Sequence, residues 1–282
     1  MPPIQDTMEK ATIPGISIAH ISPDGTLSTR TFGAADTRSK APVVPDTVFE
    51  AASLSKPVFA YLVLKAVERG LFSRDGESPE SGLDRPLHEI CAFGPLPLRT
   101  HPNYRLLTVR TILSHQAGLP NWFKPREDED YLATVGTRFD YSGVAYCFLD
   151  EVLQHVSGQP LDVLSQAVFE RLDMKHSRFV APAEGTRAIG HDAAGRADTR
   201  EHFPSALRPN PAASLFTTAE DYVKFLTACL QDEFIRKHLF EPQIDLRDKD
   251  PRAIKGDMAL DALKSMRWGL GMGLQQAENG DL

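Results

Sequence analysis

The chain has 282 residues, 41% of them hydrophobic and 24% charged, a composition typical of a globular protein that buries a core. Its 31 basic and 38 acidic residues give a formal net charge of -7, which excludes a basic surface for nucleic acid or anionic membrane. Only three cysteines are present, none in a Cys-x-x-Cys pair, so a disulfide scaffold and a zinc site are disfavoured.

The sequence also predicts where the protein resides. Its longest apolar run, residues 57–64, is far shorter than the ~20 residues that a membrane span needs. The first twelve residues carry charges of both signs and no apolar signal core. We therefore expect a cytoplasmic protein without a membrane partner.

The predicted elements begin with a hairpin and continue mainly as helices. Residues 15–21 and 27–32 alternate apolar and polar side chains around a Pro23-Asp24-Gly25 turn, which indicates two antiparallel strands. Residues 58–72 are apolar on nearly every side, as in a buried helix, and the Gly- and Pro-rich residues 73–104 are predicted to be a surface connection. Further helices are expected at 108–115, 144–156, 160–172 and 217–230.

A glycine-rich strand is expected last, at residues 267–275, and the Thr217-x-x-Glu220 spacing predicts a capping box for the preceding helix. Strands, then helices, then a strand indicate an α+β fold. We predict a sheet-containing half from 1–60 and 205–282 and a mainly helical half from 61–204, with the active site in the crevice between them.

The strongest candidate for chemistry is the Ser53-x-x-Lys56 motif. Three residues span about one helical turn, which places a hydroxyl and an amine on one face, and Pro57 requires the helix to begin close to Ser53. A lysine made neutral by burial takes the proton of a serine hydroxyl and so produces a nucleophile. The motif alone is not specific, because it occurs about once by chance in a chain of this length.

The surrounding residues are more specific than the motif. Residues 46–56 (DTVFEAASLSK) closely resemble the nucleophile segment of the serine β-lactamase-like family, which includes class C β-lactamases, family VIII esterases and D-aminopeptidases. Further matches occur in the family's order and at similar spacing. They are residues 13–16 (IPGI), 32–36 (FGAAD), 108–120 (TVRTILSHQAGLP), 139–146 (FDYSGVAY) and 217–221 (TTAED).

The resemblance implies a β-lactamase/transpeptidase-like fold, in which an antiparallel sheet is flanked by helices and joined to a helical subdomain. It also implies the catalytic residues: Ser53 as the acylated nucleophile, Lys56 as its base and Tyr141 as the second proton-transfer group. No metal or organic cofactor is implied. The expected substrate is a small ester, amide or β-lactam.

One departure from the family lies in the tyrosine motif, which usually reads Tyr-x-Asn. This chain has Gly143 at the third position, so the contact that the asparagine carboxamide makes with a substrate amide is lost. A site that hydrogen-bonds an amide discriminates strongly for it. Gly143 therefore shifts our expectation toward simpler esters.

The second departure is the family's third motif, Lys-Thr-Gly or His-x-Gly, which follows the strand that residues 268–274 (WGLGMGL) resemble. The sequence ends at Leu282 without it. The strand that bears this motif supplies one backbone donor of the oxyanion hole, and losing one donor lowers the rate on the order of 10²–10³-fold. We expect either the N-terminal part of a longer enzyme or a truncated, impaired form whose sheet lacks its last strands.

These observations predict a serine hydrolase that acts through an acyl-serine intermediate, with esterase or β-lactamase-like activity. The alternative is a non-catalytic or impaired member that binds a ligand in the same cleft. The absent third motif, Gly143 and the Ala213-Ser214 pair, where family members often have glycines, favour this alternative.

Overall fold

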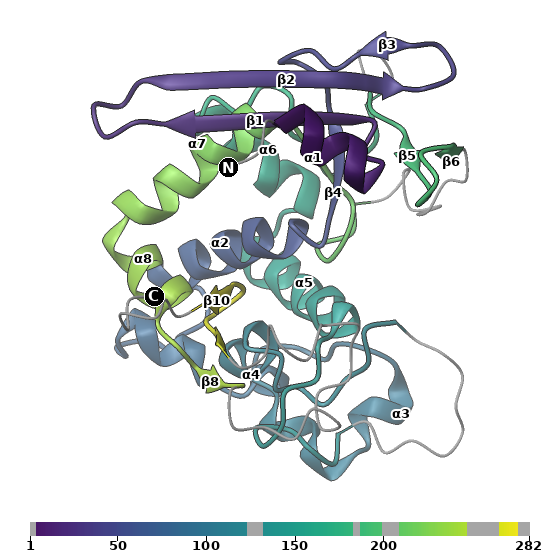
Figure 1. Ribbon diagram of the computed structural model, residues 1–282. Helices are drawn as coiled ribbons and strands as arrows, with labels where there is room; N and C mark the ends of the chain where they lie inside the picture. Colours follow the sequence, from purple (N-terminus) through teal and green to yellow (C-terminus); the bar gives the residue numbers. More distant parts are fainter. Residues whose placement is uncertain (1–3, 123–131, 183–186, 199–208, 247–264, 276–282) are drawn as a thin grey trace. The chain divides into compact units, whose positions relative to one another are not determined.

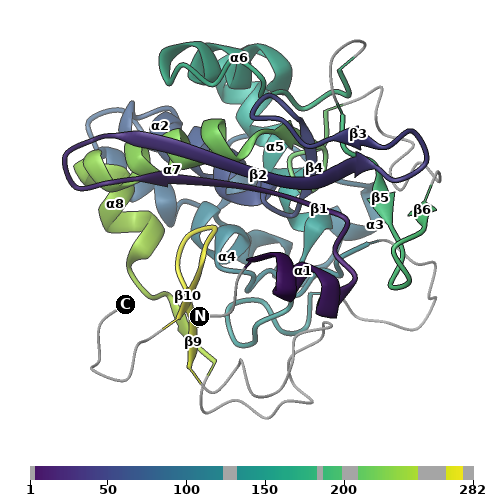
Figure 2. The ribbon, with the colours of Figure 1, turned by 45° about the horizontal axis from the view of Figure 1, so that its top comes forward.

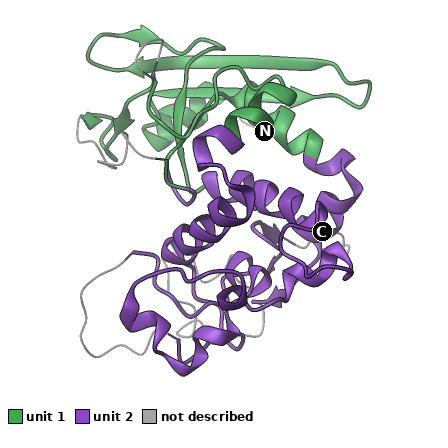
Figure 3. Ribbon diagram, turned by 180° about the vertical axis from the view of Figure 1, so that it is seen from behind, with its two compact units in different colours: residues 1–53, 165–210, 214–228 green, residues 54–164, 211–213, 229–282 purple. Residues whose placement is uncertain are grey.

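The computed structural model describes residues 4–122, 132–182, 187–198, 209–246 and 265–275. The chain forms two compact units, shown separately coloured in Figure 3. Unit 1 comprises residues 1–53, 165–210 and 214–228, and unit 2 comprises residues 54–164, 211–213 and 229–282. Within the described residues, no helix is both long and apolar enough to cross a bilayer.

The predicted hairpin is confirmed in unit 1. Strands β1 (Gly15–Ile21) and β2 (Leu27–Asp36) pair antiparallel along their lengths, and β3 (Ala41–Pro42) joins the far edge of β2 (Figure 2). The turn between β1 and β2 uses Gly25, whose φ of 84° is one that glycine adopts without strain. Helix α1 (Ile4–Ala11) packs on this hairpin through the buried Met8, since a Cβ on Gly33 would lie 3.0 Å from its methyl carbon.

The described residues of unit 1 also form two further pairs of strands. Strand β4 (Phe49–Ala52) pairs antiparallel with β7 (Leu215–Thr217), and β5 (Gly190–His191) pairs with β6 (Ala197–Asp198). Helix α6 (Leu161–Arg171) confirms the helix expected at 160–172, and α7 (Ala219–Gln231) confirms the helix expected at 217–230.

The predicted cap of α7 is displaced by one residue. The backbone N–H of Asp221 donates to Thr218 Oγ1 at 3.1 Å, so Thr218 is the capping side chain and the Thr217–Glu220 assignment is wrong. Thr217 Oγ1 lies 2.7 Å from Ser177 Oγ in a buried hydrogen bond. Two adjacent threonines offer equivalent caps in the sequence, and Ser177 decides between them.

Unit 2 is built around the helix that the apolar run predicts. Helix α2 (Ser55–Glu68) is buried along most of its length and packs against α5 (Gly143–Ser157) and α8 (Glu233–Phe240), as Figure 1 shows. Helix α4 (Val109–Leu113) confirms the helix expected at 108–115, and the Thr108 side chain caps it by accepting from the Thr111 N–H at 3.1 Å. Gly158 ends α5 in the left-handed conformation, with φ of 67°.

The prediction of a surface connection over residues 73–104 is wrong. This segment contains four short helices and contributes buried side chains, among them Leu87 and Phe93, which are 0% exposed. Tyr104 Oη donates to the Phe93 carbonyl at 2.9 Å and accepts from the Phe93 N–H at 3.0 Å. Prolines begin several of these helices. The helices are η1 (Pro79–Leu83), η2 (Leu87–Glu89), α3 (Leu96–Arg99) and η3 (Pro102–Leu106).

The single glycine-rich strand expected at 267–275 is instead a hairpin. Strands β9 (Met266–Trp268) and β10 (Gly273–Gln275) pair antiparallel, and β8 (Ile244–Asp245) pairs with β9. The glycines between the strands let the backbone pack closely against neighbouring residues, as a glycine-rich segment indicates. A Cβ on Gly269 would lie 2.1 Å from the Leu239 carbonyl oxygen, and one on Gly271 would lie 2.3 Å from Ala60 Cβ.

The bounds of the two units differ from those of the predicted halves. Residues 165–204 group with the hairpin, because Arg178 forms an antiparallel bridge with Phe216 of β7. Residues 229–282 group with the helices, because α8 packs on α2. Contacts between segments distant in the sequence set these bounds.

A buried carboxyl group on α5 yields a stability prediction. Asp150 is 8% exposed, its Oδ1 has no hydrogen-bond partner, and burial raises its pKa from 3.8 to about 6. Between these pH values the folded chain binds more protons than the unfolded chain, so the free energy of unfolding falls as pH rises through this window. We expect Asp150→Asn to raise the free energy of unfolding at pH 7 by about 1–2 kcal/mol, below the limit of about 3 kcal/mol that the shift sets.

Urea denaturation at pH 7 and pH 4 measures this effect, and Asp75→Asn at an exposed loop position serves as the control. The gain should shrink at pH 4, where the wild-type carboxyl is protonated in the folded state. An equal gain at both pH values would show that the carboxylate charge is not the cause.

Candidate active site

Ser53 lies in the exposed turn that joins β4 to α2. Ala52, directly before it, has a φ of 44°, a conformation that costs free energy in a residue with a Cβ. Leu54, directly after it, has helical angles (φ -65°, ψ -8°), and α2 begins at Ser55. The helix therefore begins within two residues of Ser53, as Pro57 predicts. Ser53 is the last residue of the first segment of unit 1, and Lys56 follows it three positions later in unit 2.

Lys56 is buried in the first turn of α2 and is 1% exposed. Its Nζ donates a hydrogen bond of 2.9 Å to the backbone carbonyl of Ala212. Burial lowers its pKa from 10.5 to about 8, because the charged ammonium loses its hydration. A substantial neutral fraction near pH 8 makes this amine a competent base.

The structure brings Tyr141 next to Lys56 within unit 2. Lys56 Nζ lies 4.7 Å from the centroid of the Tyr141 ring and 5.8 Å from that of Tyr146. Both distances permit a cation–π interaction when the amine is protonated. Tyr141, half-buried, is one of the three predicted site residues.

Tyr146 was not singled out as a site residue, although it ends the segment that resembles the tyrosine motif. It is 0% exposed, its hydroxyl donates to the Leu113 carbonyl at 3.3 Å, and burial raises its pKa well above the usual value. Its phenol therefore stays neutral and forms an aromatic wall beside Lys56. Tyr141 precedes α5 and Tyr146 lies within it, so the five-residue spacing between them does not reveal this role.

The His115 ring packs against the Tyr141 ring. Its ring is 0% exposed and lies 4.3 Å from the Tyr141 ring, centroid to centroid. Its Nδ1 accepts the Ser142 backbone N–H at 3.0 Å, and its own carbonyl accepts from the Asp140 N–H at 2.7 Å. Burial and the nearby Lys56 hold the pKa of His115 well below its usual value, so the ring is neutral and acts as a structural hydrogen-bond acceptor.

Asn121 holds the start of α5 and also was not predicted. Its backbone carbonyl and its side-chain Oδ1 both accept from the Gly143 N–H, at 3.2 and 3.1 Å. A Cβ on residue 143 would lie 2.8 Å from the Asn121 carbonyl oxygen, so glycine is required here on packing grounds. Only the three-dimensional pairing of these two segments reveals this contact.

Cys147 lies one turn beyond Gly143 on α5, where its thiol interacts electrostatically with Lys56. Burial raises the pKa of this thiol to about 11. The thiolate is the nucleophilic form of cysteine, so Cys147 is a poor nucleophile at neutral pH. The ionisable groups around Lys56 therefore favour a lysine base over a cysteine nucleophile.

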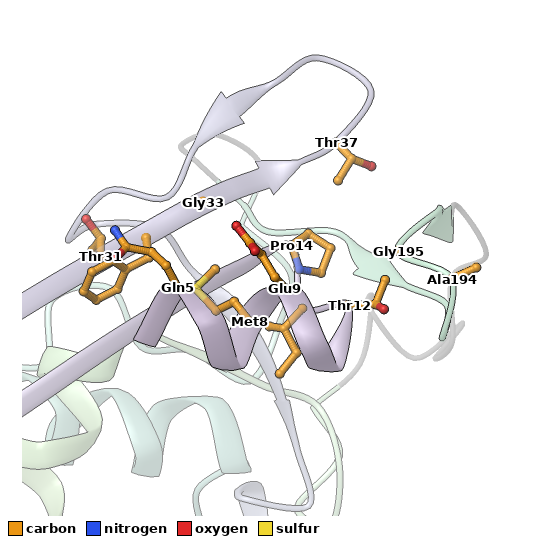
Figure 4. A pocket seen from close by; sticks show the side chains of 12 residues that line it. Gln5, Met8, Glu9, Thr12, Pro14, Thr31, Gly33, Thr37, Ala194 and Gly195 are labelled. Carbon is orange, nitrogen blue, oxygen red and sulfur yellow. The ribbon is translucent and has the colours of Figure 1, made fainter. Parts of the chain in front are cut away.

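Unit 1 contains an open hollow of about 730 Å³ beside α1, which Figure 4 shows from close by. Its lining combines apolar groups such as Met8, Pro14 and Phe32 with hydroxyls such as Thr12 and Thr37. Glu9 is the only charged side chain among the lining residues. No nucleophile and base meet among them, so this hollow lacks the features of a hydrolytic site.

The chain matches known proteins along most of its length. Residues 4–281 match the family described as Beta-lactamase. Esterase EstB of Burkholderia gladioli is 26% identical over 252 residues, which cover 71% of this chain and 61% of EstB. Penicillin-binding protein 4* of Bacillus subtilis is 25% identical over 186 residues, which cover 58% of this chain and 38% of that protein. The matched part of this chain thus spans about three-fifths or less of the length of these two curated relatives.

Solved structures share the fold. A class C β-lactamase superposes with a TM-score of 0.71 at 20% identity, covering 95% of this chain and 71% of that one. The D-alanine carboxypeptidase AmpC of Burkholderia cenocepacia gives a TM-score of 0.70 at 22% identity, covering 98% and 73%. These similarities confirm the predicted β-lactamase/transpeptidase-like α+β fold. The family match over residues 4–281 shows that this chain belongs to the Beta-lactamase family.

Proposed function

We propose that this chain hydrolyses a small ester or amide through an acyl intermediate on Ser53. The observation that carries the proposal is the buried Lys56, whose pKa is lowered to about 8 and which lies against the Tyr141 ring. Ser53 precedes it by three residues in an exposed turn, where a substrate carbonyl can reach the hydroxyl. The similarity to EstB, a protein named as an esterase, supports an ester substrate.

The proposed reaction begins with neutral Lys56. Its amine removes the Ser53 hydroxyl proton as Oγ attacks the substrate carbonyl carbon, and a tetrahedral intermediate forms. The intermediate collapses, the bond to the leaving group breaks, and Tyr141 gives its proton to that group and recovers one from protonated Lys56. Water then attacks the acyl-serine, the bond from the acyl carbon to Ser53 Oγ breaks, and one water proton restores the Ser53 hydroxyl as the carboxylic acid is released.

A fluorophosphonate tests this proposal directly, because it phosphonylates an activated serine and loses fluoride. We expect one adduct by intact mass and its location at Ser53 by peptide mapping. Ser53→Ala should remove the adduct, whereas Ser39→Ala, at an exposed turn of the hairpin, should retain it. Absence of labelling in the wild-type chain would overturn the proposal and favour a non-catalytic protein that binds a ligand.

A further inference from the structure

We propose that Trp268 is a positioning residue: its indole holds the Tyr141 ring in the orientation from which the phenol gives its proton to the leaving group. This inference rests on the proposed function and deepens it, because it names a residue that controls the second proton transfer. Trp268 lies on β9, an element that carries none of the predicted site residues.

The backbone on either side of Tyr141 is fixed by His115. The Asp140 N–H donates to the His115 carbonyl at 2.7 Å, and the Ser142 N–H donates to His115 Nδ1 at 3.0 Å. These bonds place the Cα of Tyr141 but leave its side chain free to rotate about χ1 and χ2. The phenol oxygen is bonded rigidly to the ring, so contacts that fix the ring also fix the proton donor.

Two aromatic side chains contact the Tyr141 ring. The His115 ring lies 4.3 Å away, centroid to centroid, with 36° between the planes. The Trp268 ring lies 5.9 Å away at 81°, an edge-to-face arrangement that aromatic pairs favour. Trp268 and His115 also contact each other, at 5.0 Å. One tilted ring and one nearly perpendicular ring together restrict rotation of the Tyr141 side chain.

The hairpin that carries Trp268 packs directly on the helix that carries Lys56. A Cβ on Gly271, between β9 and β10, would lie 2.3 Å from Ala60 Cβ in α2. The indole therefore holds Tyr141 against the same framework as the Lys56 amine, which lies 4.7 Å from the centroid of the Tyr141 ring. This separation matters because, in the proposed reaction, Tyr141 recovers its proton from Lys56.

Trp268 acts through its ring rather than through its N–H. The side chain is 9% exposed, and its Nε1 has no hydrogen-bond partner within the described residues. A buried donor without a partner is unfavourable, so a hydrogen bond does not explain the choice of tryptophan. Phenylalanine keeps an aromatic ring and has no N–H, whereas leucine has no ring. We therefore expect phenylalanine, and not leucine, to replace Trp268.

Two esters of pentanoic acid test the inference, the p-nitrophenyl ester and the ethyl ester. p-Nitrophenolate leaves without a proton, whereas ethoxide needs one from Tyr141. We expect Trp268→Leu to lower kcat/KM by about 10-fold or more for the ethyl ester, and by less than about 3-fold for the p-nitrophenyl ester. Trp268→Phe should retain ethyl ester turnover within about 3-fold of wild type. Titration of the released acid at constant pH measures both reactions.

Tyr141→Phe should show the same selective loss. The double variant with Trp268→Leu should lose no more than Tyr141→Phe alone, because Trp268 acts through Tyr141. Phe93→Leu is the matched control, since Phe93 is 0% exposed and its ring packs on Tyr104 and Phe148 instead. It should leave the ratio of the two rates unchanged. Trp268→Met, whose flexible side chain fills more of the space, should show the same selective loss and replaces Trp268→Leu if circular dichroism shows that variant unfolded.

Equal losses for the two esters in Trp268→Leu, or losses that add in the double variant, would overturn the inference while Ser53-dependent turnover persists. A wild-type chain that turns over the p-nitrophenyl ester and not the ethyl ester would also overturn it, because no group then protonates the leaving group. Absence of any Ser53-dependent turnover in the wild-type chain would overturn the proposed function and this inference together.

Discussion

Ser53→Ala is expected to lower kcat/KM for an activated ester by at least about 10⁴-fold, because it removes the hydroxyl on which the proposed acyl intermediate forms. The exposed position of Ser53 makes this change nearly neutral for folding, within about 0.5 kcal/mol in the free energy of unfolding. The loss should therefore be catalytic rather than structural.

Stopped-flow release of p-nitrophenol from p-nitrophenyl pentanoate, an activated ester, measures this loss. The wild-type chain should show a burst of up to one equivalent when deacylation is slow, and Ser53→Ala should show none. Ser39→Ala, in the exposed turn between β2 and β3, should behave as wild type. Turnover in Ser53→Ala above about 1% of wild type would contradict the assignment of the nucleophile.

Lys56→Met is the second change with a large expected effect, a loss of about 10²–10⁴-fold in kcat/KM. Methionine fills a similar volume but has no proton acceptor of comparable strength. Its effect on stability combines two opposing contributions. Removing the buried amine relieves about 3 kcal/mol, from the pKa shift of 10.5 to about 8, and losing the hydrogen bond from Lys56 to the Ala212 carbonyl costs about 1–3 kcal/mol. The variant should therefore remain folded while it loses activity.

The pH dependence of kcat/KM and of stability also tests whether Lys56 is the base. The base is neutral Lys56, so wild-type kcat/KM should rise with pH through about 8 and level off above it. Between about pH 8 and 10.5 the unfolded chain binds more protons than the folded chain, so the wild-type free energy of unfolding should also rise across that window. Lys56→Met should show neither the rise of kcat/KM through pH 8 nor the rise in the free energy of unfolding that Lys56 causes between pH 8 and 10.5.

Lys65→Met provides the matched control on the same helix. Lys65 forms ion pairs with Asp232, at 2.9 Å, and with Glu68, and its hydrogen bonds to these carboxylates raise its pKa against the opposing effect of burial. This variant should retain wild-type turnover and the rise of kcat/KM through pH 8. A rise that persists in Lys56→Met, or disappears in Lys65→Met, would show that another group is the base.

The sequence by itself determined the elements whose signals are local. The hairpin at β1 and β2 follows from alternation around Gly25, and α2 follows from an apolar run that begins at Pro57. Thr108 and Gly158 mark helix ends because a cap depends on residues within one turn. The motif segments, read in order, also determined the family, which the comparisons confirm.

The errors arose where packing between distant segments decides the structure. Residues 73–104 look polar and irregular, yet Phe93 is buried because Tyr104 satisfies both of its backbone polar groups. Thr217 and Thr218 are equivalent caps until Ser177 engages one of them. The strand expected at 267–275 folds back because its glycines pack against Leu239 and Ala60.

The same distinction applies to the candidate site. The sequence named Ser53, Lys56 and Tyr141 from spacing and motif, and these assignments remain predictions that the variants above test. Only the tertiary structure placed the Lys56 amine beside the Tyr141 ring and brought the Asn121 carboxamide to Gly143, 22 residues further along the chain. Spacing along one helix determines which side chains share a face, whereas a lowered lysine pKa depends on burial and on partners that folding brings from elsewhere in the chain.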